Sequence, residues 1–312
     1  MPGQEGIPSV FSPMTRTLDD LIYFARSFIG MKCWQWDHSV HPLEWREGAV
    51  EQIRESKRFK VGVLRSDGVV DPSPACARAL EETVSALRSQ GHDCVDISPP
   101  SPYLALQIAS SLLNSDGCRT FLSFFRTGET NDPGARQMSL YMRLPRSLKY
   151  LHFLWVKYVR RDAVWAGLLE NWHAKSSFEQ WKLVSKRESY KATWHEWWNR
   201  EGYDFLLTPV NATPAVPHKG MKEALDYSCG IMPVTKVDRD SDQLPESFDF
   251  KKLNGVAKGA YAHYDSKAMH GLPVAVQIVG RRLEEEKVLA VMQRVSDALE
   301  SSGKRYPLLD ID

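Results

Sequence analysis

Two pairs of residues in this sequence have types and spacings that could support chemistry. His38 and His41 lie three positions apart, as two ligands of one metal ion could, but only one acidic residue stands near them. Ser301 and Lys304 have the spacing at which a lysine could activate a serine. Gly303 lies between them and suits a helix C-cap, and a lysine there suits the helix dipole. We therefore predict a helix end at this point, and no metal or cofactor site in the chain.

Longer catalytic and nucleotide-binding motifs are absent from the sequence. It contains no G-x-S-x-G, H-E-x-x-H, phosphate-binding loop or G-x-G-x-x-G pattern. Its five cysteines are scattered and form no C-x-x-C, which is typical of reduced thiols in a cytoplasmic protein. Forty basic residues against 39 acidic ones give a net charge of +1, so no general positive field favours nucleic acid as a partner. No uncharged apolar run reaches the roughly 18 residues that a membrane span requires.

The pattern of apolar residues predicts an α/β domain. With 312 residues, 43% of them hydrophobic, the chain has the composition of a globular protein. Short apolar runs typical of buried strands occur at 59–64, 94–97, 203–208, 231–237 and 273–279. Helical patterns occur at 18–29, 74–91, 103–200 (broken near 131–134) and 283–299. Apolar strands flanked by helices predict a sheet with parallel pairs, covered by helices on both faces.

We expect residues 1–312 to form a single domain, because no linker or repeat divides them. Its parts would be a leading loop and helix at 1–30, a Trp-rich helical cap at 140–200, and closing strands and a helix at 203–312. Seven of the ten tryptophans lie between Trp155 and Trp198, which sets the cap apart from the rest of the chain.

Five segments of the chain resemble motifs of the amidase signature family, in the same order. They are Pro13–Leu21 (PMTRTLDDL), Asp71–Leu80 (DPSPACARAL), Phe205–Pro209 (FLLTP), Met232–Thr235 (MPVT) and Gly271–Gly280 (GLPVAVQIVG). The resemblance is nearest to fatty acid amide hydrolases and fungal acetamidases, and it runs from about Gly3 to Val295. It implies the C-terminal portion of the amidase signature fold, a mixed sheet with helices on both faces.

The resemblance also implies an activity and a mechanism. The family hydrolyses carboxylic and fatty acid amides to an acid and an amine, using a serine nucleophile, a bridging serine and a lysine base. These residues and the oxyanion loop precede the part of the family that Gly3 resembles, so we expect no catalytic residue in this chain. The chain is then expected to be inactive alone, as a truncated or misspliced amidase. The alternative is a non-catalytic pseudoenzyme that binds acyl ligands or a partner amidase half.

Two positions depart from the family pattern, and three are expected to bind substrate. Ser12 replaces the usual glycine, and the join across 217–226 is shorter than in relatives, as a splicing error would produce.

A small-molecule amide or acyl substrate is expected to contact Leu144, Leu148 and Met232. We also expect the missing front half to leave an exposed sheet edge and apolar face, through which the chain would self-associate.

The segment 143–161 (RLPRSLKYLHFLWVKYVRR) holds six basic residues and no acidic one. Its apolar residues recur at helical spacing, as in helices that lie in a membrane interface with cations on anionic headgroups. The resemblance places it at the membrane cap of fatty acid amide hydrolases. The expected membrane contacts are Arg146, Lys149, Leu151, Trp155 and Lys157. A helix packed on the sheet is the main alternative, and RNA binding is a third that no RNA-recognition motif supports.

Overall fold

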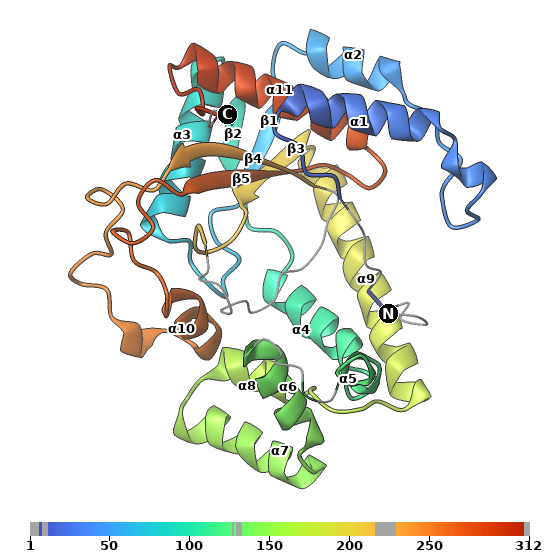
Figure 1. The fold of residues 1–312 in the computed structure, drawn as a ribbon, viewed down its shortest axis with the longest axis vertical. Helices are drawn as coiled ribbons and strands as arrows, with labels where there is room; N and C mark the ends of the chain where they lie inside the picture. The colour runs from blue at the N-terminus through green and yellow to red at the C-terminus, as the bar shows by residue number, and fades with distance from the viewer. Residues whose placement is uncertain (1–5, 8–11, 127, 129–132, 216–228, 309–312) are drawn as a thin grey trace.

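The computed structural model describes residues 6–7, 12–126, 128, 133–215 and 229–308. Its centre is a five-stranded sheet in the order β2–β1–β3–β5–β4 (Figure 1). The strands are β1 (Lys60–Val63), β2 (Asp93–Asp96), β3 (Phe205–Pro209), β4 (Cys229–Lys236) and β5 (Pro273–Val279). β1 pairs in parallel with β2 and β3, whereas β5 runs antiparallel to β3 and β4. The predicted strands and the mixed sheet are thus confirmed. The shortened join at 217–226 lies outside the described residues.

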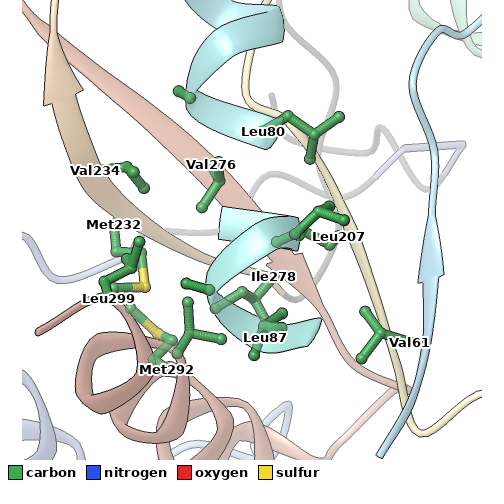
Figure 2. Packing of buried hydrophobic residues seen from close by; sticks show 14 of the residues in the cluster. Val61, Leu80, Leu87, Leu207, Met232, Val234, Val276, Ile278, Met292 and Leu299 are labelled. Atoms are coloured by element: carbon green, nitrogen blue, oxygen red, sulfur yellow. The ribbon is translucent and has the colours of Figure 1, made fainter. Parts of the chain in front are cut away.

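One face of the sheet packs against α3 (Pro74–Ser89) and α11 (Glu285–Ser301) (Figure 1). Alternate strand residues point to this face, so the side chains of Val61, Leu207 and Ile278 meet Leu87 of α3 (Figure 2). All four are fully or almost fully buried, which makes this layer the main hydrophobic core. Helices α1 (Leu18–Gly30) and α2 (Glu47–Glu55) lie against the outer side of α11. Helix α2 was not predicted from the sequence.

Around β2 and β3, the opposite face of the sheet is covered by the end of α9 (Ser177–Glu201). Trp197 and Trp198 of this helix pack with Tyr203 and Leu206, and the indole N–H of Trp198 donates to the Tyr203 carbonyl at 2.7 Å. A capping box at Ser176 begins the helix, and Gly202, with φ 67°, ends it. Several of the clustered tryptophans therefore serve as the second helical layer of the sheet.

A separate group of helices lies at the end of the molecule far from α11 (Figure 1). It contains α4 (Pro102–Leu113), α5 (Arg119–Ser123), α6 (Pro133–Arg143), α7 (Arg146–Leu154) and α8 (Ala163–Leu169). A π-helical turn, Trp155–Val159, continues α7. Short 3₁₀ turns at Cys33–Gln35 and Phe250–Lys252, and α10 (Gly255–Tyr261), complete the described elements. Phe153, Val156, Ala166 and Leu169 form a small core that joins α7 to α8. Because the end of α9 packs on the sheet, the name cap is used from here on for residues 140–169 and not for the predicted 140–200.

Candidate functional site

The structure separates the three residues predicted to contact a substrate. Leu144 and Leu148 lie in the cap, where they are 40% and 49% exposed. Met232 lies on β4 at the other end of the molecule, buried beside Met292 and Leu299 of α11 (Figures 1 and 2). Strand alternation directs Met232 to the same face as Val234, which is the core face. Met232 is therefore a core residue, and only the two leucines remain accessible to a ligand.

Helix α7 presents two different sides. Because successive residues turn by about 100° around a helix, Leu148 and Leu151 lie roughly opposite Arg146, Tyr150 and Phe153. On the first side Leu148, Leu151 and Trp155 are exposed by 49%, 60% and 48%. Tyr158 and Val159 of the π-helical turn extend this exposed apolar area, which we call the cap surface. An exposed apolar area of this kind is typical of a binding surface.

Two cations border the cap surface. The ammonium of Lys157 lies 5.4 Å from the ring centres of both Phe153 and Tyr158, and the guanidinium of Arg160 lies 5.6 Å from that of Trp155. Helix α7 packs on α8 and the π-helical turn, and its small core contains no strand residue. The alternative of a helix packed on the sheet is therefore wrong for this segment.

Lys149 occupies a different position from the one predicted. Its side chain is buried, and its ammonium donates to the Met142 carbonyl oxygen at 2.9 Å. Burial lowers the pKa of Lys149 from its ordinary value. The helix periodicity that places Lys149 beside Arg146 turns it away from Leu151, so it cannot contact whatever the cap surface contacts. Arg146 is exposed, but on this second side of the helix.

The two residue pairs with chemical spacing do not form reactive sites. Ser301 donates from its hydroxyl to the Asp297 carbonyl at 2.8 Å, while the Lys304 ammonium lies 3.6 Å from the Glu82 carboxylate. Gly303 has a φ of 71°, as the predicted helix end requires. Within the described residues, no three His, Cys, Asp or Glu side chains gather as metal ligands would, and His41 lies on an exposed loop.

One strongly built polar cluster is structural. The guanidinium of Arg78 on α3 donates to both oxygens of Asp242, at 2.9 and 2.8 Å, and to the Lys236 carbonyl at 2.8 Å. Asp242 is almost fully buried, and the hydrogen bond with it holds the pKa of Arg78 above its ordinary value. The pair ties α3 to the loop after β4, and it points to no cavity or reacting group.

Comparison with known proteins establishes the class of this protein. The sequence model of the amidase family matches residues 1–289, so the chain belongs to the amidase family. An acetamidase of Aspergillus oryzae is 30% identical over 313 residues, which cover 96% of this chain and 52% of the relative. Fatty-acid amide hydrolase 1 of Sus scrofa is 28% identical over 307 residues, covering 94% of this chain and 51% of its own length.

A solved structure confirms the fold. A fatty acid amide hydrolase superposes with a TM-score of 0.71 at 23% identity, over 95% of this chain and 49% of that protein. The resemblance identified from the five motifs is therefore confirmed as family membership. The chain spans about half the length of the curated relatives it matches. No helix among the described residues is both long and apolar enough to cross a membrane.

Proposed function

We propose that this chain forms the C-terminal domain of an amidase whose complete catalytic assembly hydrolyses carboxylic or fatty acid amides. The observation that carries the proposal is the family match along residues 1–289, combined with a span of about half the relatives' length. The sequence holds no glycine- and serine-rich oxyanion loop. A serine nucleophile needs such donors, and a base within hydrogen-bond reach. We therefore propose that the isolated chain does not hydrolyse amides and that the Ser–Ser–Lys triad acts from a complementary half.

The sheet offers a surface for that half. On β4, Ile231 points away from the core and is 52% exposed, and the neighbouring Pro233 is exposed too. Proline is tolerated there because β4 is an edge strand with a bulge between Pro233 and Thr235. Val210, after β3, is 38% exposed. This area, defined by Ile231, Pro233 and Val210, is the open sheet face, and the same apolar surface would also support homo-oligomers when no complementary half is present.

Co-expression tests this proposal. The chain would be purified alone and with the N-terminal half of a related amidase, and both would be assayed with acetamide and oleamide. We expect activity only from the co-expressed pair, and none when the nucleophile serine of the partner half is replaced by alanine. Ile231→Asp should weaken co-purification, whereas Tyr23→Asp, on the exposed side of α1, should not. Hydrolysis by the isolated chain above a buffer control would contradict the proposal. Co-purification without activity would favour the non-catalytic binding protein.

We also propose that the cap surface contacts anionic membranes peripherally. Leu148, Leu151 and Trp155 would contribute roughly 1.5–3 kcal/mol each if fully inserted. Lys157 and Arg160 would add about 1 kcal/mol each near an anionic surface. Neither contribution alone anchors a protein stably, so binding should need both and weaken as salt shortens the Debye length. Together with the cytoplasmic setting expected from the scattered cysteines, this contact leads us to propose a cytoplasmic protein that associates reversibly with membranes.

Vesicle co-sedimentation tests the membrane contact. We expect the wild type to pellet with anionic vesicles at low salt, less at high salt, and Leu151→Glu/Trp155→Glu to remain in the supernatant. Tyr23→Glu is the control, because Tyr23 is more exposed than Leu151 and Trp155 and lies on α1 at the other end of the molecule. Equal pelleting of wild type and the double variant would remove the proposal.

A further inference from the structure

A groove of about 470 Å³ lies on the second side of α7, between that helix and the N-terminal half of α9. Five cationic side chains line it: Arg146, Lys149, Lys175, Lys182 and Lys186. Only two carboxylates, Glu170 and Glu179, accompany them. The volume is in the range of small-molecule binding sites. We call this cavity the basic groove, and its excess of positive charge is the feature that needs explanation.

Within the described part of the chain, the cations of the groove have few anionic partners. The Glu179 carboxylate accepts from the Ser176 N–H at 2.8 Å and hydroxyl at 2.9 Å, as its capping role requires. Lys149 is committed to the Met142 carbonyl. Arg146, Lys182 and Lys186 form no ion pair among the described residues. Three donor-rich side chains therefore face the groove without a carboxylate partner.

Lys175 is the most unusual of these groups. Its side chain is partly buried, and its ammonium lies 2.9 Å from Nε2 of His173, with no carboxylate partner in the described structure. The pKa of Lys175 is lowered to about 8, mainly by burial; the charge of Arg146 also lowers it, whereas Glu179 and Glu170 oppose the shift. Burial also lowers the pKa of His173, together with the charges of Lys175, Arg146 and Lys149. An ammonium desolvated among other cations is unfavourable, and a bound anion would relieve that cost.

Part of the groove wall is apolar and aromatic. Tyr150, Phe153, Trp172 and Leu183 supply this part of the lining. A site that combines convergent cations with an apolar wall suits a ligand that has a charged head and an apolar body. The groove lies on the side of α7 opposite Leu148 and Leu151. A bilayer in contact with the cap surface would therefore not face the basic groove. This geometry favours a monomeric ligand over a membrane headgroup as the occupant of the groove.

We propose that the basic groove is a binding site for a monomeric anionic amphiphile, with its carboxylate, sulfate or phosphate held by Lys175, Arg146 and Lys182. The apolar body of the ligand lies along Tyr150, Trp172 and Leu183. Lys175 and His173 form the inner end of the site, and the exposed Lys182 forms its rim. The site is independent of amide hydrolysis and requires no complementary half.

Isothermal titration calorimetry with short amphiphiles below their micellar concentrations tests the proposal. We expect octanoate and octyl sulfate to bind. Acetate and sulfate lack the apolar body, and octyl glucoside lacks the charge, so each of these three should bind at least about tenfold more weakly. Lys175→Met and Lys182→Met should each raise the dissociation constant about tenfold, since each removes one charge-assisted hydrogen bond. Lys251→Met, at an exposed site on the 3₁₀ turn, is the matched control and should change nothing.

A pH series separates a ligand contact from a structural role. Neither octanoate nor octyl sulfate titrates between pH 7 and 9, His173 is neutral there, and Glu179, with its lowered pKa, is ionised. The wild type should bind more weakly at pH 9 than at pH 7 as Lys175 loses its proton, and Lys175→Met should lose this dependence. Lys182→Met, at an exposed position, tests the site without disturbing the cap core. The proposal would be overturned if the wild type did not bind, if both groove variants bound as tightly as the wild type, or if binding occurred only to anionic vesicles.

Discussion

The main core and the cap use the same side chains in opposite ways. Leu87 on α3 is fully buried between the sheet and α11, whereas Leu151 on α7 is 60% exposed. In the core, strands and helices come from distant parts of the chain and close around each other. In the cap, a small cluster holds three helices together and leaves apolar side chains outside. The comparison indicates that the core supplies stability, while the cap leaves apolar side chains accessible at its surface.

The largest effect should come from breaking the buried ion pair of the core side. Arg78→Ala leaves the Asp242 carboxylate buried without its partner, and this should cost about 3–5 kcal/mol in the free energy of unfolding. Urea denaturation measures the change. The control is Arg305→Ala, which removes an exposed ion pair with Glu300 and should cost less than about 1 kcal/mol. Similar losses in both variants would show that Asp242 is not desolvated as the structure indicates.

Two leucines, Leu87 in the main core and Leu151 in the cap, test the difference between these two regions directly. Leu87→Ala should cost about 2–5 kcal/mol, because it leaves a cavity in close-packed surroundings. Leu151→Ala should change the free energy of unfolding by less than about 0.5 kcal/mol, because its side chain is already mostly in water. Thermal and urea unfolding of both variants would measure this. A large loss in Leu151→Ala would mean that the cap surface is covered in solution.

Gly230 tests how closely the core is packed. A Cβ at this position on β4 would overlap Sδ of Met292, so Gly230→Ala forces the α11 side chain to move. Because methionine is flexible, we expect a loss of only about 1 kcal/mol in the free energy of unfolding. The double variant with Met292→Ala should show less than the sum of the two losses. Gly48→Ala, in open space on helix α2, should be neutral or stabilising.

The last prediction concerns pH, and the effects should have opposite directions on the core side and at the basic groove. Burial alone would raise the pKa of Glu286, but hydrogen bonds from Arg46 and from the backbone N–H of Glu286 together outweigh burial and leave the pKa lowered. Its contribution to stability is therefore present above the unfolded pKa and lost as pH falls through the folded pKa. For Lys175, the folded pKa of about 8 lies below the ordinary 10.5, so the unfolded chain binds more protons and stability rises between these values. The melting temperature should depend less on pH in the acid range for Glu286→Gln, and less on pH in the basic range for Lys175→Met, than it does for the wild type. An unchanged pH dependence would contradict the assignments.

The sequence by itself determined the strands, helices α1, α3 and α11, and the family. Apolar runs predicted all five strands, and the helical pattern at 74–91 predicted α3, whose Leu80, Val84 and Leu87 are buried. Five ordered motifs were enough to identify the amidase family. These features are local, because strand and helix periodicities and turn residues depend on neighbours in the chain. Helix α2 was missed because its pattern of two buried residues, Val50 and Ile53, is too short to stand out.

Only the tertiary structure decided what each side of an element contacts. Helical spacing places Lys149 opposite Leu151, but it does not say which side is covered. Contacts with Met142 and Tyr141 of α6 bury Lys149. Strand alternation likewise allows Met232 to point to either face, and the position of α11 makes that face the core. Lys175 and His173 sit in an irregular loop before α9, and the basic groove forms only when α7 folds beside them. Periodicity defines directions relative to one element, whereas burial and charge partners depend on residues that are distant in sequence and meet only in the folded chain.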